Sequence, residues 1–479
     1  MTVKGPQRVI PRPSERHRRV ARRASDITIV DDPNDVEIID SDAASKGASI
    51  FVTIGILGVL ASTIGFFFLG FTGRAETSIG IVFIPVAGVV GYASIRRWVV
   101  TSPKEEWLGA LVFAGLGLRL LAAVPRLLGG ADAPLYQLTG VRISESLRDL
   151  DFAVDTGRAI PGTGAVRYLS GIVNVFTGSN YLATFVVFLA FALIGQVAFL
   201  KGVRGTLTPR QFRLFALLMM FSPTLAFWPS SIGKESVVLF GTGLIALGAS
   251  RLYNRAWNGV APVLFGIFSI GMVRPHVAIV ILIGMSIGLL ARRAHTKGRM
   301  MSHLLVLTVV IVGSMWAAGA AAQLVGLESL DGLSDISAAL DFTEERTSQD
   351  NSQFTAPRVD SFASYPWAFV TVLFRPFPWE AGSPIALLSA VEGVALMLLA
   401  LRALPGAFVY LGDLMQRGQM LFAAAYTAIF VFLFSAIGNF GILSRQRAQV
   451  IPFVLLLICL LYTPPSPRDA TLSRMPSSA

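Results

Sequence analysis

Long apolar segments alternate with shorter polar ones along most of this chain of 479 residues. A helix rises about 1.5 Å per residue, so roughly 20 mainly apolar residues cross the ~30 Å hydrocarbon layer of a bilayer. Twelve segments are mainly apolar and have about that length, and each is predicted to be a membrane-spanning helix. They are residues 49–71, 77–95, 107–125, 181–200, 212–229, 235–250, 258–273, 276–291, 303–324, 384–402, 419–438 and 447–463.

The composition agrees with a membrane protein and excludes a soluble globular one. Hydrophobic residues make up 53% of the chain, charged residues only 14%, and the mean hydropathy is +0.64. A single soluble core cannot bury that much apolar surface. The one cysteine, Cys459, lies in an apolar run and has no partner for an internal disulfide. We therefore predict an all-α fold, a polytopic transmembrane helix bundle of about 12 spans that occupies residues 48–465.

The basic residues between the predicted spans indicate which helix ends face the cytoplasm. Residues 1–47 are polar and lack an apolar period, so they are predicted to be a disordered cytoplasmic tail. With that tail inside, residues 466–479 also form a cytoplasmic tail, and the net charge of +11 reflects orientation rather than nucleic-acid binding. The basic residues are almost all arginine, which is typical of a GC-rich bacterial genome, and the expected location is a bacterial cytoplasmic membrane. Four successive inside loops satisfy the positive-inside rule, with Arg96, Arg97 and Lys104, then Lys201, Arg204, Arg210 and Arg213, then Arg251 and Arg255, then Arg292, Arg293, Lys297 and Arg299.

Two segments on the opposite, extracytoplasmic side are predicted to be more than simple loops. Residues 129–180 contain amphipathic helical patches near 138–154 and 164–177, separated by a turn rich in Gly and Pro. These patches are expected to lie along the outer membrane face. Residues 325–382 begin with an acidic stretch and end in an aromatic and proline-rich stretch at 366–382, which suits the interfacial zone of a bilayer.

Ionisable residues close to the outer ends of these spans are candidates for function, because a charge at membrane depth is costly to bury. Asp132 directly follows the third span, where a partly desolvated carboxylate could act as a general base toward a hydroxyl nucleophile. The alternative is a turn or helix-capping aspartate before Pro134. The full set is Asp132, Lys234, Glu235, Arg274, His276, Arg375, Glu380, Glu392, Arg445 and Arg447.

The segment around Lys234 is predicted to bind a phosphate. Ser230 or Ser231 could cap a helix whose free backbone N–H groups, positive end and Lys234 converge on one spot. The segment is not a P-loop, because Glu235 replaces the Ser or Thr that follows the lysine in that motif. The alternative is a capped helix whose Lys234 reaches out to water beside Glu235.

Further positive residues are expected at the same membrane face. Pro275 breaks the chain between Arg274 and His276, and both could donate to phosphate oxygens or could form a simple turn. Arg445 and Arg447 lie outside, where the positive-inside rule disfavours them, so an anionic partner such as a ligand phosphate or a lipid headgroup is expected.

Arg375 and Glu380 either contact a substrate or pair with each other at the surface. No His, Cys or Asp spacing in the sequence is typical of an all-protein metal site, although a divalent cation could be held jointly by a carboxylate and a substrate phosphate.

These features resemble the GT-C class of membrane glycosyltransferases, and the resemblance covers most of residues 105–465. Motif by motif, the chain is similar to a group of largely uncharacterised bacterial GT-C-like proteins. It departs from the class in that Asp132 is a lone acid rather than one of an adjacent acidic pair. The motifs are Asp132 with Tyr136, Gly162-Thr163, Arg167-Tyr168-Leu169, the segment from Phe227 to Glu235, Arg274-Pro275-His276, the segment from Phe374 to Glu380, and Arg445-Gln446-Arg447.

The resemblance implies an enzyme that transfers a sugar from a polyprenyl-phosphate-linked donor to a glycan, lipid or protein acceptor on the extracytoplasmic face. It implies that Asp132 is the base and that Lys234, Arg274, His276 and Arg445 or Arg447 stabilise the leaving phosphate. Tyr136, Arg167, Glu235, Arg375 and Glu380 would then contact substrate or the interface. Three alternatives remain open at this point: a polymerase or ligase of lipid-linked polysaccharide, a transporter or flippase of lipid-linked sugars, and a structural or assembly subunit.

Overall fold

A computed structural model describes residues 33–71, 77–102, 105–129, 132–254, 256–290, 352–414 and 418–461, together with residue 308. The described chain is helical, and its one β-bridge joins Gln353 to Asn439. The predicted span at 303–324 and most of the acidic stretch after it lie outside the described residues. So do residues 1–32 and the tail at 466–479.

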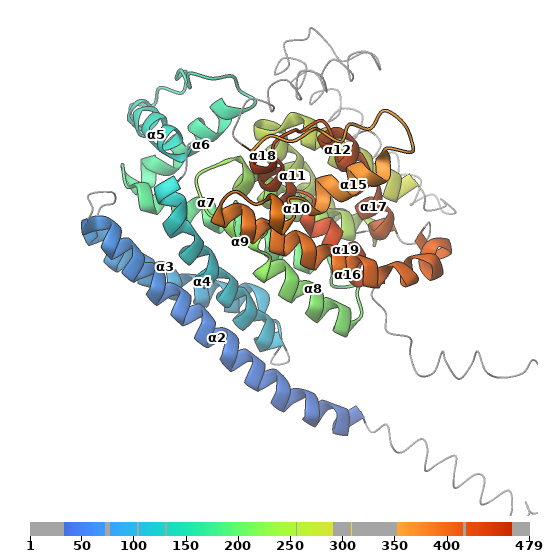
Figure 1. The fold of residues 1–479 in the computed structure, drawn as a ribbon. Coiled ribbons are helices and arrows are strands. Elements are labelled where there is room, and N and C mark those ends of the chain that lie inside the picture. The colour runs from blue at the N-terminus through green and yellow to red at the C-terminus, as the bar shows by residue number, and fades with distance from the viewer. Residues whose placement is uncertain are drawn as a thin grey trace, which may run out of the picture.

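The N-terminal half begins with three long helices that form one group. Helices α2 (Pro33–Phe71), α3 (Thr77–Val99) and α4 (Glu106–Gly129) pack against one another, and Figure 1 shows them as the blue and blue-green group beneath the rest of the bundle. Helix α2 begins at Pro33, so residues 33–47, which were predicted to be disordered, are helical. The physical reason is local, because Pro favours the first position of a helix and the acidic residues that follow favour its N-terminal end.

The remaining helices form the main bundle and the layer above it. Helices α5 (Ala133–Arg148) and α6 (Thr163–Thr177) pack against each other at the top left of Figure 1. The bundle contains α7 (Tyr181–Val203), α8 (Pro209–Phe221), α9 (Pro223–Phe227), α10 (Lys234–Tyr253), α11 (Val260–Val273), α12 (Pro275–Leu290), α15 (Tyr365–Phe374), α16 (Pro384–Leu414), α17 (Gly418–Phe434), α18 (Phe440–Arg447) and α19 (Ile451–Leu461), with short 3₁₀ turns at Trp257–Gly259 and Pro378–Glu380.

Six described helices are long and apolar enough to cross a membrane, or seven if α18 and α19, which meet at a bend of 63°, count as one. The prediction of one span over 212–229 is wrong, because the chain breaks at Ser222 and Pro223 into α8 and α9. Pro223 cannot donate a backbone hydrogen bond to continue α8, and the Ser222 side chain accepts one from the Leu225 N–H and so caps α9. Helices α11, α12 and α17 are apolar but shorter.

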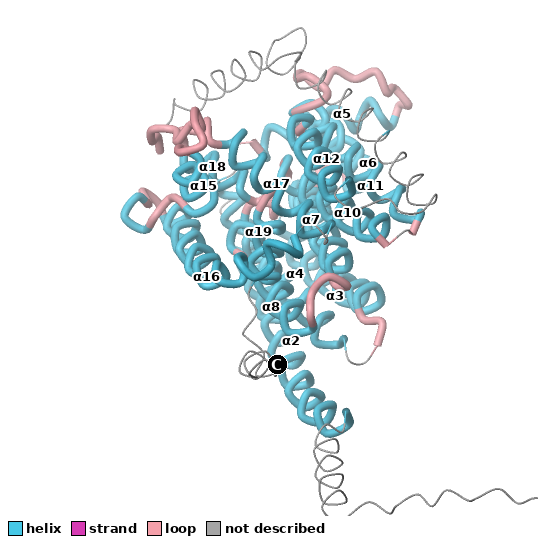
Figure 2. Tube along the Cα trace, turned by 90° about the vertical axis from the view of Figure 1, so that its right-hand side faces the viewer, coloured by secondary structure: helices cyan, strands magenta, loops and turns pink. Residues whose placement is uncertain are grey.

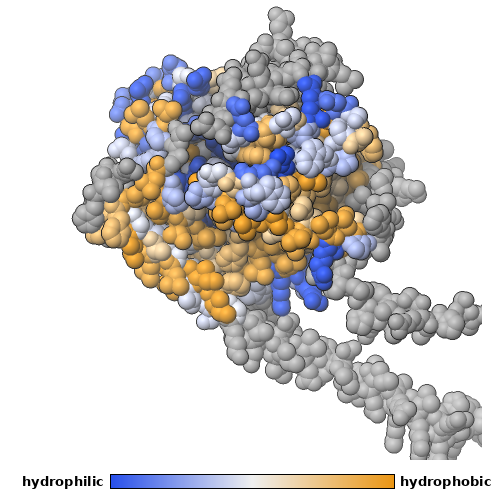
Figure 3. Space-filling model, in the orientation of Figure 1, coloured by the Kyte–Doolittle hydropathy of each residue, from blue (hydrophilic) through white to orange (hydrophobic). Residues whose placement is uncertain are grey.

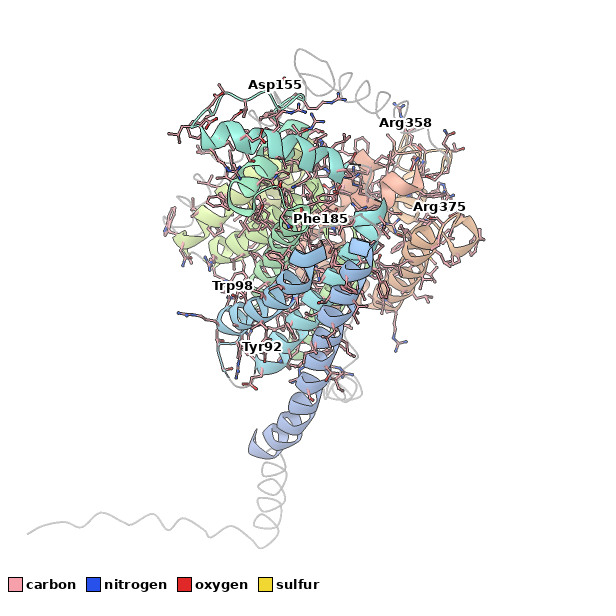
Figure 4. All side chains as sticks on the ribbon, turned by 90° about the vertical axis from the view of Figure 1, so that its left-hand side faces the viewer. Tyr92, Trp98, Asp155, Phe185, Arg358 and Arg375 are labelled. Atoms are coloured by element: carbon pink, nitrogen blue, oxygen red, sulfur yellow. The ribbon has the colours of Figure 1, made fainter. Side chains whose placement is uncertain are left out.

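The surface agrees with insertion into a bilayer. Large apolar side chains are exposed along α2, α3 and α16, and Figure 3 shows the apolar residues as a broad band below the more polar upper part. A soluble monomer rarely exposes so much contiguous apolar surface. In Figure 2 many of the described loops gather at one end of the molecule, and in Figure 4 Asp155 and Arg358 lie toward that end, Tyr92 and Trp98 toward the other, and Phe185 and Arg375 between them.

Helix α10 crosses its neighbours at glycines, which lets the backbones touch. A Cβ on Gly243 would overlap the carbonyl oxygen of Gly195 in α7, and a Cβ on Gly241 would lie too close to the carbonyl of Gly266 in α11. Small residues at such crossings are the usual means of close helix packing in membranes.

We therefore expect Gly243→Ala to lower the unfolding midpoint of the purified protein clearly, because the added methyl forces α7 and α10 apart, at a cost of about 1–3 kcal/mol. Thermal unfolding in detergent measures the effect. Gly382→Ala is the matched control, since a Cβ at Gly382 meets nothing within 4 Å. Equal stability of the two variants would show that this crossing is not tightly packed.

Candidate functional site

A cavity of about 540 Å³ lies where the ends of several helices meet. It lies beside the start of α5 and is bounded by the first residue of α10, the junction of α11 with α12, and α18. Leu135, which lines the cavity, is also largely exposed. The lining residues are Asp132, Leu135, Tyr136, Arg158, Thr163, Arg167, Lys234, Val273, Arg274, His276, Ile442, Arg445 and Gln446.

A chain of ion pairs runs behind and along the wall of this cavity. The Arg445 Nε donates to Glu235 Oε1 at 2.6 Å and its Nη2 donates to Glu235 Oε2 at 3.2 Å, while its Nη1 donates to Asp132 Oδ2 at 2.9 Å. Arg274 donates to the same Glu235 oxygen, Oε1, and also to the Gln446 side chain. Glu235 is buried, so its charge is stabilised by two arginines rather than by water.

Asp132 occupies the N-cap position of α5, but its side chain makes no capping hydrogen bond. Pro134 lies in the first turn of α5, where a proline loses no helical hydrogen bond. The Asp132 carboxylate instead points to Arg445, which is 313 positions later in the chain. Asp132 therefore has the backbone position of a helix cap, but the prediction that its side chain caps the helix is wrong.

The first two residues of helix α10, Lys234 and Glu235, lie at the site. Its N-cap is Gly233, not Ser230 or Ser231 as the sequence suggested. The Ser230 hydroxyl donates to the carbonyl of Ala226, and the Ser231 oxygen accepts a hydrogen bond from Arg126 at 2.8 Å. Lys234 lines the cavity, whereas both serines are turned to other partners.

The break between α11 and α12 supplies two more residues. Arg274 follows the last residue of α11 and its backbone N–H bonds to the Ile270 carbonyl, and Pro275 then starts α12. The Arg274 side chain is buried and donates a hydrogen bond to Glu235. His276 reaches the cavity from the first turn of α12. The break therefore places both residues at the cavity, and their contact with phosphate stays a prediction.

The layer formed by α5 and α6 closes one side of the cavity with Tyr136 and Arg167. Burial, and then the nearby Asp132 carboxylate, raises the pKa of Tyr136 to about 12, so its hydroxyl stays protonated at neutral pH and can donate a hydrogen bond. Arg167 donates to the carbonyl of Thr156 at 2.7 Å, which ties α6 to the loop that precedes it.

Four polar residues near the site were not among the predicted site residues, although Thr163 and Gln446 belong to motifs that carry the resemblance. Arg158, Thr163 and Gln446 line the cavity, and Arg126 lies close by with its guanidinium over the rings of Phe227 and Trp228 at 5.3 and 5.2 Å. Arg126 ends the third apolar run, so the rule that selected Asp132 would also have found it. Arg158 lies in an irregular segment, where the apolar pattern carries no information about position.

Arg447 is not part of the cavity, contrary to its prediction as a phosphate-binding residue. It is fully buried and donates to the backbone carbonyls of Val372, at 3.2 Å, and Arg375. Glu392 is likewise buried away from the cavity, where it accepts hydrogen bonds from Ser222 and Thr224 at the break between α8 and α9. Both residues hold helix ends together.

Arg375 and Glu380 pair with each other, which confirms one of the two interpretations of this segment. The Arg375 Nε lies 3.0 and 3.1 Å from the two Glu380 oxygens, and its guanidinium is 5.0 Å from the ring centres of both Phe354 and Phe440. Burial acts to raise the pKa of the Glu380 carboxyl, but hydrogen bonds from Arg375 and from the Phe377 N–H bring it below its ordinary value. Neither residue lines the cavity.

Within the part of the chain that the structure describes, no group of three or more His, Cys, Asp or Glu residues is arranged to hold a metal ion. The two carboxylates nearest the cavity, Asp132 and Glu235, are both engaged by Arg445. Five cationic side chains, by contrast, line it: Arg158, Arg167, Lys234, Arg274 and Arg445.

In the part of the chain that the structure describes, the fold is helical, several helices have membrane-spanning length, and a cavity lined by five cationic side chains lies at the helix ends. Comparison of the chain with protein-family models, with curated protein sequences and with solved structures finds no significant match.

Proposed function

We propose that this chain is a GT-C-like glycosyltransferase that transfers a sugar from a polyprenyl-phosphate-linked donor to a glycan, lipid or protein acceptor. The observation that carries the proposal is the convergence on one cavity of a half-exposed carboxylate, Asp132, with five cationic side chains. These residues come from distant parts of the sequence, and an acid beside a cluster of cations is what transfer from a phosphate-linked sugar requires.

In the proposed reaction an acceptor hydroxyl attacks the anomeric carbon of the donor sugar, and the bond from that carbon to the phosphate oxygen breaks. Asp132 takes the proton of the hydroxyl as general base. The leaving phosphate gains negative charge, which Lys234, Arg274 and Arg445 stabilise while His276 and Tyr136 offer further polar contacts. Inversion at the anomeric carbon is what the GT-C class implies.

The lipid part of the donor needs access from the bilayer. Leu135 lines the cavity and is 55% exposed, and Leu138, one turn further along α5, is also exposed. A polyprenyl chain lying against these side chains would place its phosphate near the cavity cations while the tail stays in apolar surroundings. The exposed apolar edge of α5 thus supports a lipid-linked donor over a soluble nucleotide sugar.

The proposal includes a topology of about twelve spans in a bacterial cytoplasmic membrane, with both termini in the cytoplasm and the cavity on the extracytoplasmic face. In support, Arg96, Arg97 and Lys201 belong to the end of the bundle opposite the cavity, where the positive-inside rule expects cations. A polymerase or ligase of lipid-linked polysaccharide is the second candidate, since it too would hold phosphate with arginines. A flippase is less well supported, because the charges of the cavity gather at helix ends rather than midway along the helices.

The test is sugar transfer in membranes that express the protein. Radiolabelled polyprenyl-phosphate sugars are supplied with cell-envelope acceptors, and transfer is compared with membranes that lack the protein. Transfer of one sugar per donor supports the glycosyltransferase. Assembly of pre-formed glycan blocks, without transfer from any monosaccharide donor, would instead favour the polymerase or ligase.

We expect the transfer to persist in EDTA, within about twofold of the untreated rate. The reason is that the five cationic side chains can take the charge of the leaving phosphate, whereas Glu235 is held by two arginines and Asp132 alone offers a single carboxylate. Transfer measured after chelation, with and without added Mg²⁺ or Mn²⁺, checks this. Loss of transfer in EDTA with recovery on adding Mg²⁺ would show that Asp132 leaves Arg445 to bind a metal together with the donor phosphate.

A further inference from the structure

Arg445 bridges two carboxylates that differ sharply in their surroundings. The Glu235 side chain is 1% exposed and receives two of the Arg445 N–H groups, whereas the Asp132 side chain is 47% exposed and receives one. An exposed ion pair is weak and exchanges easily, while breaking a buried one leaves a charge without compensation. Asp132 is therefore the partner that Arg445 can release, and Glu235 is the one that it keeps.

The cavity itself supplies the competitor for Asp132. The Nη1 group of Arg445 that reaches Asp132 belongs to a side chain that lines the cavity beside Lys234 and Arg274. A phosphate bound among these cations is held by Lys234 and Arg274 as well as by Arg445, so it competes with the Asp132 carboxylate for the same N–H group. Glu235 keeps the rest of the guanidinium in place during the exchange, because it is also held by Arg274.

We infer that Arg445 exchanges Asp132 for the phosphate of the bound ligand, with Glu235 as the fixed positioning residue. This inference rests on the proposed function in one respect, namely that Asp132 is the base and the ligand is the phosphate-linked donor. Donor binding then removes the cation from Asp132 and leaves its carboxylate free to accept the acceptor's proton. The donor binds before the acceptor hydroxyl can be activated, so the base is available only when there is a donor to attack.

The exchange is tested by ligand binding and not by transfer. The probe is farnesyl phosphate, a short polyprenyl phosphate without a sugar, titrated against the purified full-length protein in detergent. Asp132→Asn removes the competitor for Arg445, so farnesyl phosphate is expected to bind about fivefold more tightly than to the wild type. Asp149→Asn, the same change at an exposed residue that does not line the cavity, is the matched control and is expected to change the affinity by less than about twofold.

A double-mutant cycle separates exchange at Arg445 from simple repulsion between Asp132 and the phosphate. In an Arg445→Lys background the ammonium can still pair with Glu235, but it cannot bridge two carboxylates as the guanidinium does. The gain from Asp132→Asn is expected to fall below about twofold there, and Arg445→Gln serves as a second background. An equal gain with and without Arg445, or no gain in the wild-type background, would overturn the exchange.

These outcomes are distinguishable from failure of the proposed function. Equal gains in the two backgrounds would remove the exchange and leave sugar transfer untouched. A chain that transfers no sugar but shows the expected cycle would keep the exchange as a property of a phosphate-binding site that serves another reaction.

Discussion

Membranes that carry Asp132→Asn are expected to transfer sugar at least about 100-fold more slowly than wild-type membranes. The amide has the size of the carboxylate but cannot accept a proton from the acceptor hydroxyl. The measurement is transfer from radiolabelled polyprenyl-phosphate sugars at matched protein levels. Farnesyl phosphate binding by the same variant shows that the site is intact, because its affinity is expected to rise rather than fall.

The matched control is Asp149→Asn, which removes a carboxylate from the far end of α5 without touching the cavity. Its transfer rate is expected to equal that of the wild type. If Asp132→Asn kept its full activity as well, Asp132 would not be the base, and the polymerase or ligase would become the better interpretation of the site.

Glu235→Gln is expected to lower the free energy of unfolding by about 3–5 kcal/mol. The substitution removes the buried charge that compensates Arg274 and Arg445, and the neutral amide leaves a buried and a partly buried cation without that charge at the start of α10. Unfolding of the purified protein by a titrated denaturant in mixed micelles measures the loss. Transfer is expected to fall too, since both arginines lose their fixed position.

Glu106→Gln is the control for this prediction. Glu106 pairs with Arg96 at 3.1 Å in an exposed position, so its loss is expected to cost only about 0–1 kcal/mol. Equal losses for the two variants would mean that the ion-pair chain at the cavity is worth no more than a surface contact. It would then offer no fixed support for Arg445.

The sequence was most informative about where polar residues interrupt apolar helices, and least informative about which of them meet. Asp132, Lys234, Arg274 and Arg445 were each selected because they end or interrupt an apolar run, and the structure brings all of them to one cavity. Their pairing could not be predicted, because Asp132 and Arg445 are 313 positions apart and only tertiary packing sets their distance. The roles proposed for them stay predictions.

Arg445 and Arg447 show why a motif is too coarse to assign roles. Residues two positions apart in a helix point to nearly opposite sides of it. Arg445 therefore reaches the cavity from α18, while Arg447 is turned inward to the carbonyls of Val372 and Arg375. The hydrophobic pattern around them is too short to show which side is buried.

The predicted span at 212–229 failed for a different reason. Its apolar residues fit one helix, but α8 ends at the Ser222-Pro223 pair and α9 begins there. The Glu392 carboxylate from α16 stabilises the break by accepting hydrogen bonds from the backbone N–H and the hydroxyl of Thr224. Hydropathy averaged over a window is hardly changed by a single residue pair of this kind. It also contains no information on contacts with a residue as distant in sequence as Glu392.

The glycine crossings of α10 divide the cavity into a fixed wall and an adaptable one. Gly243 meets α7, and Gly241 and Gly248 meet α11 and the turn before it, so α10 cannot rotate or slide without separating three backbone contacts. Lys234 and Glu235 stand at the end of this helix and share its rigidity. Room for ligands of different shape must then come from the opposite side, where α5 and α6 pack mainly on each other. Under the proposed function, differences in acceptor preference between chains of this architecture are expected in α5 and α6, with the phosphate held at a constant position beside α10.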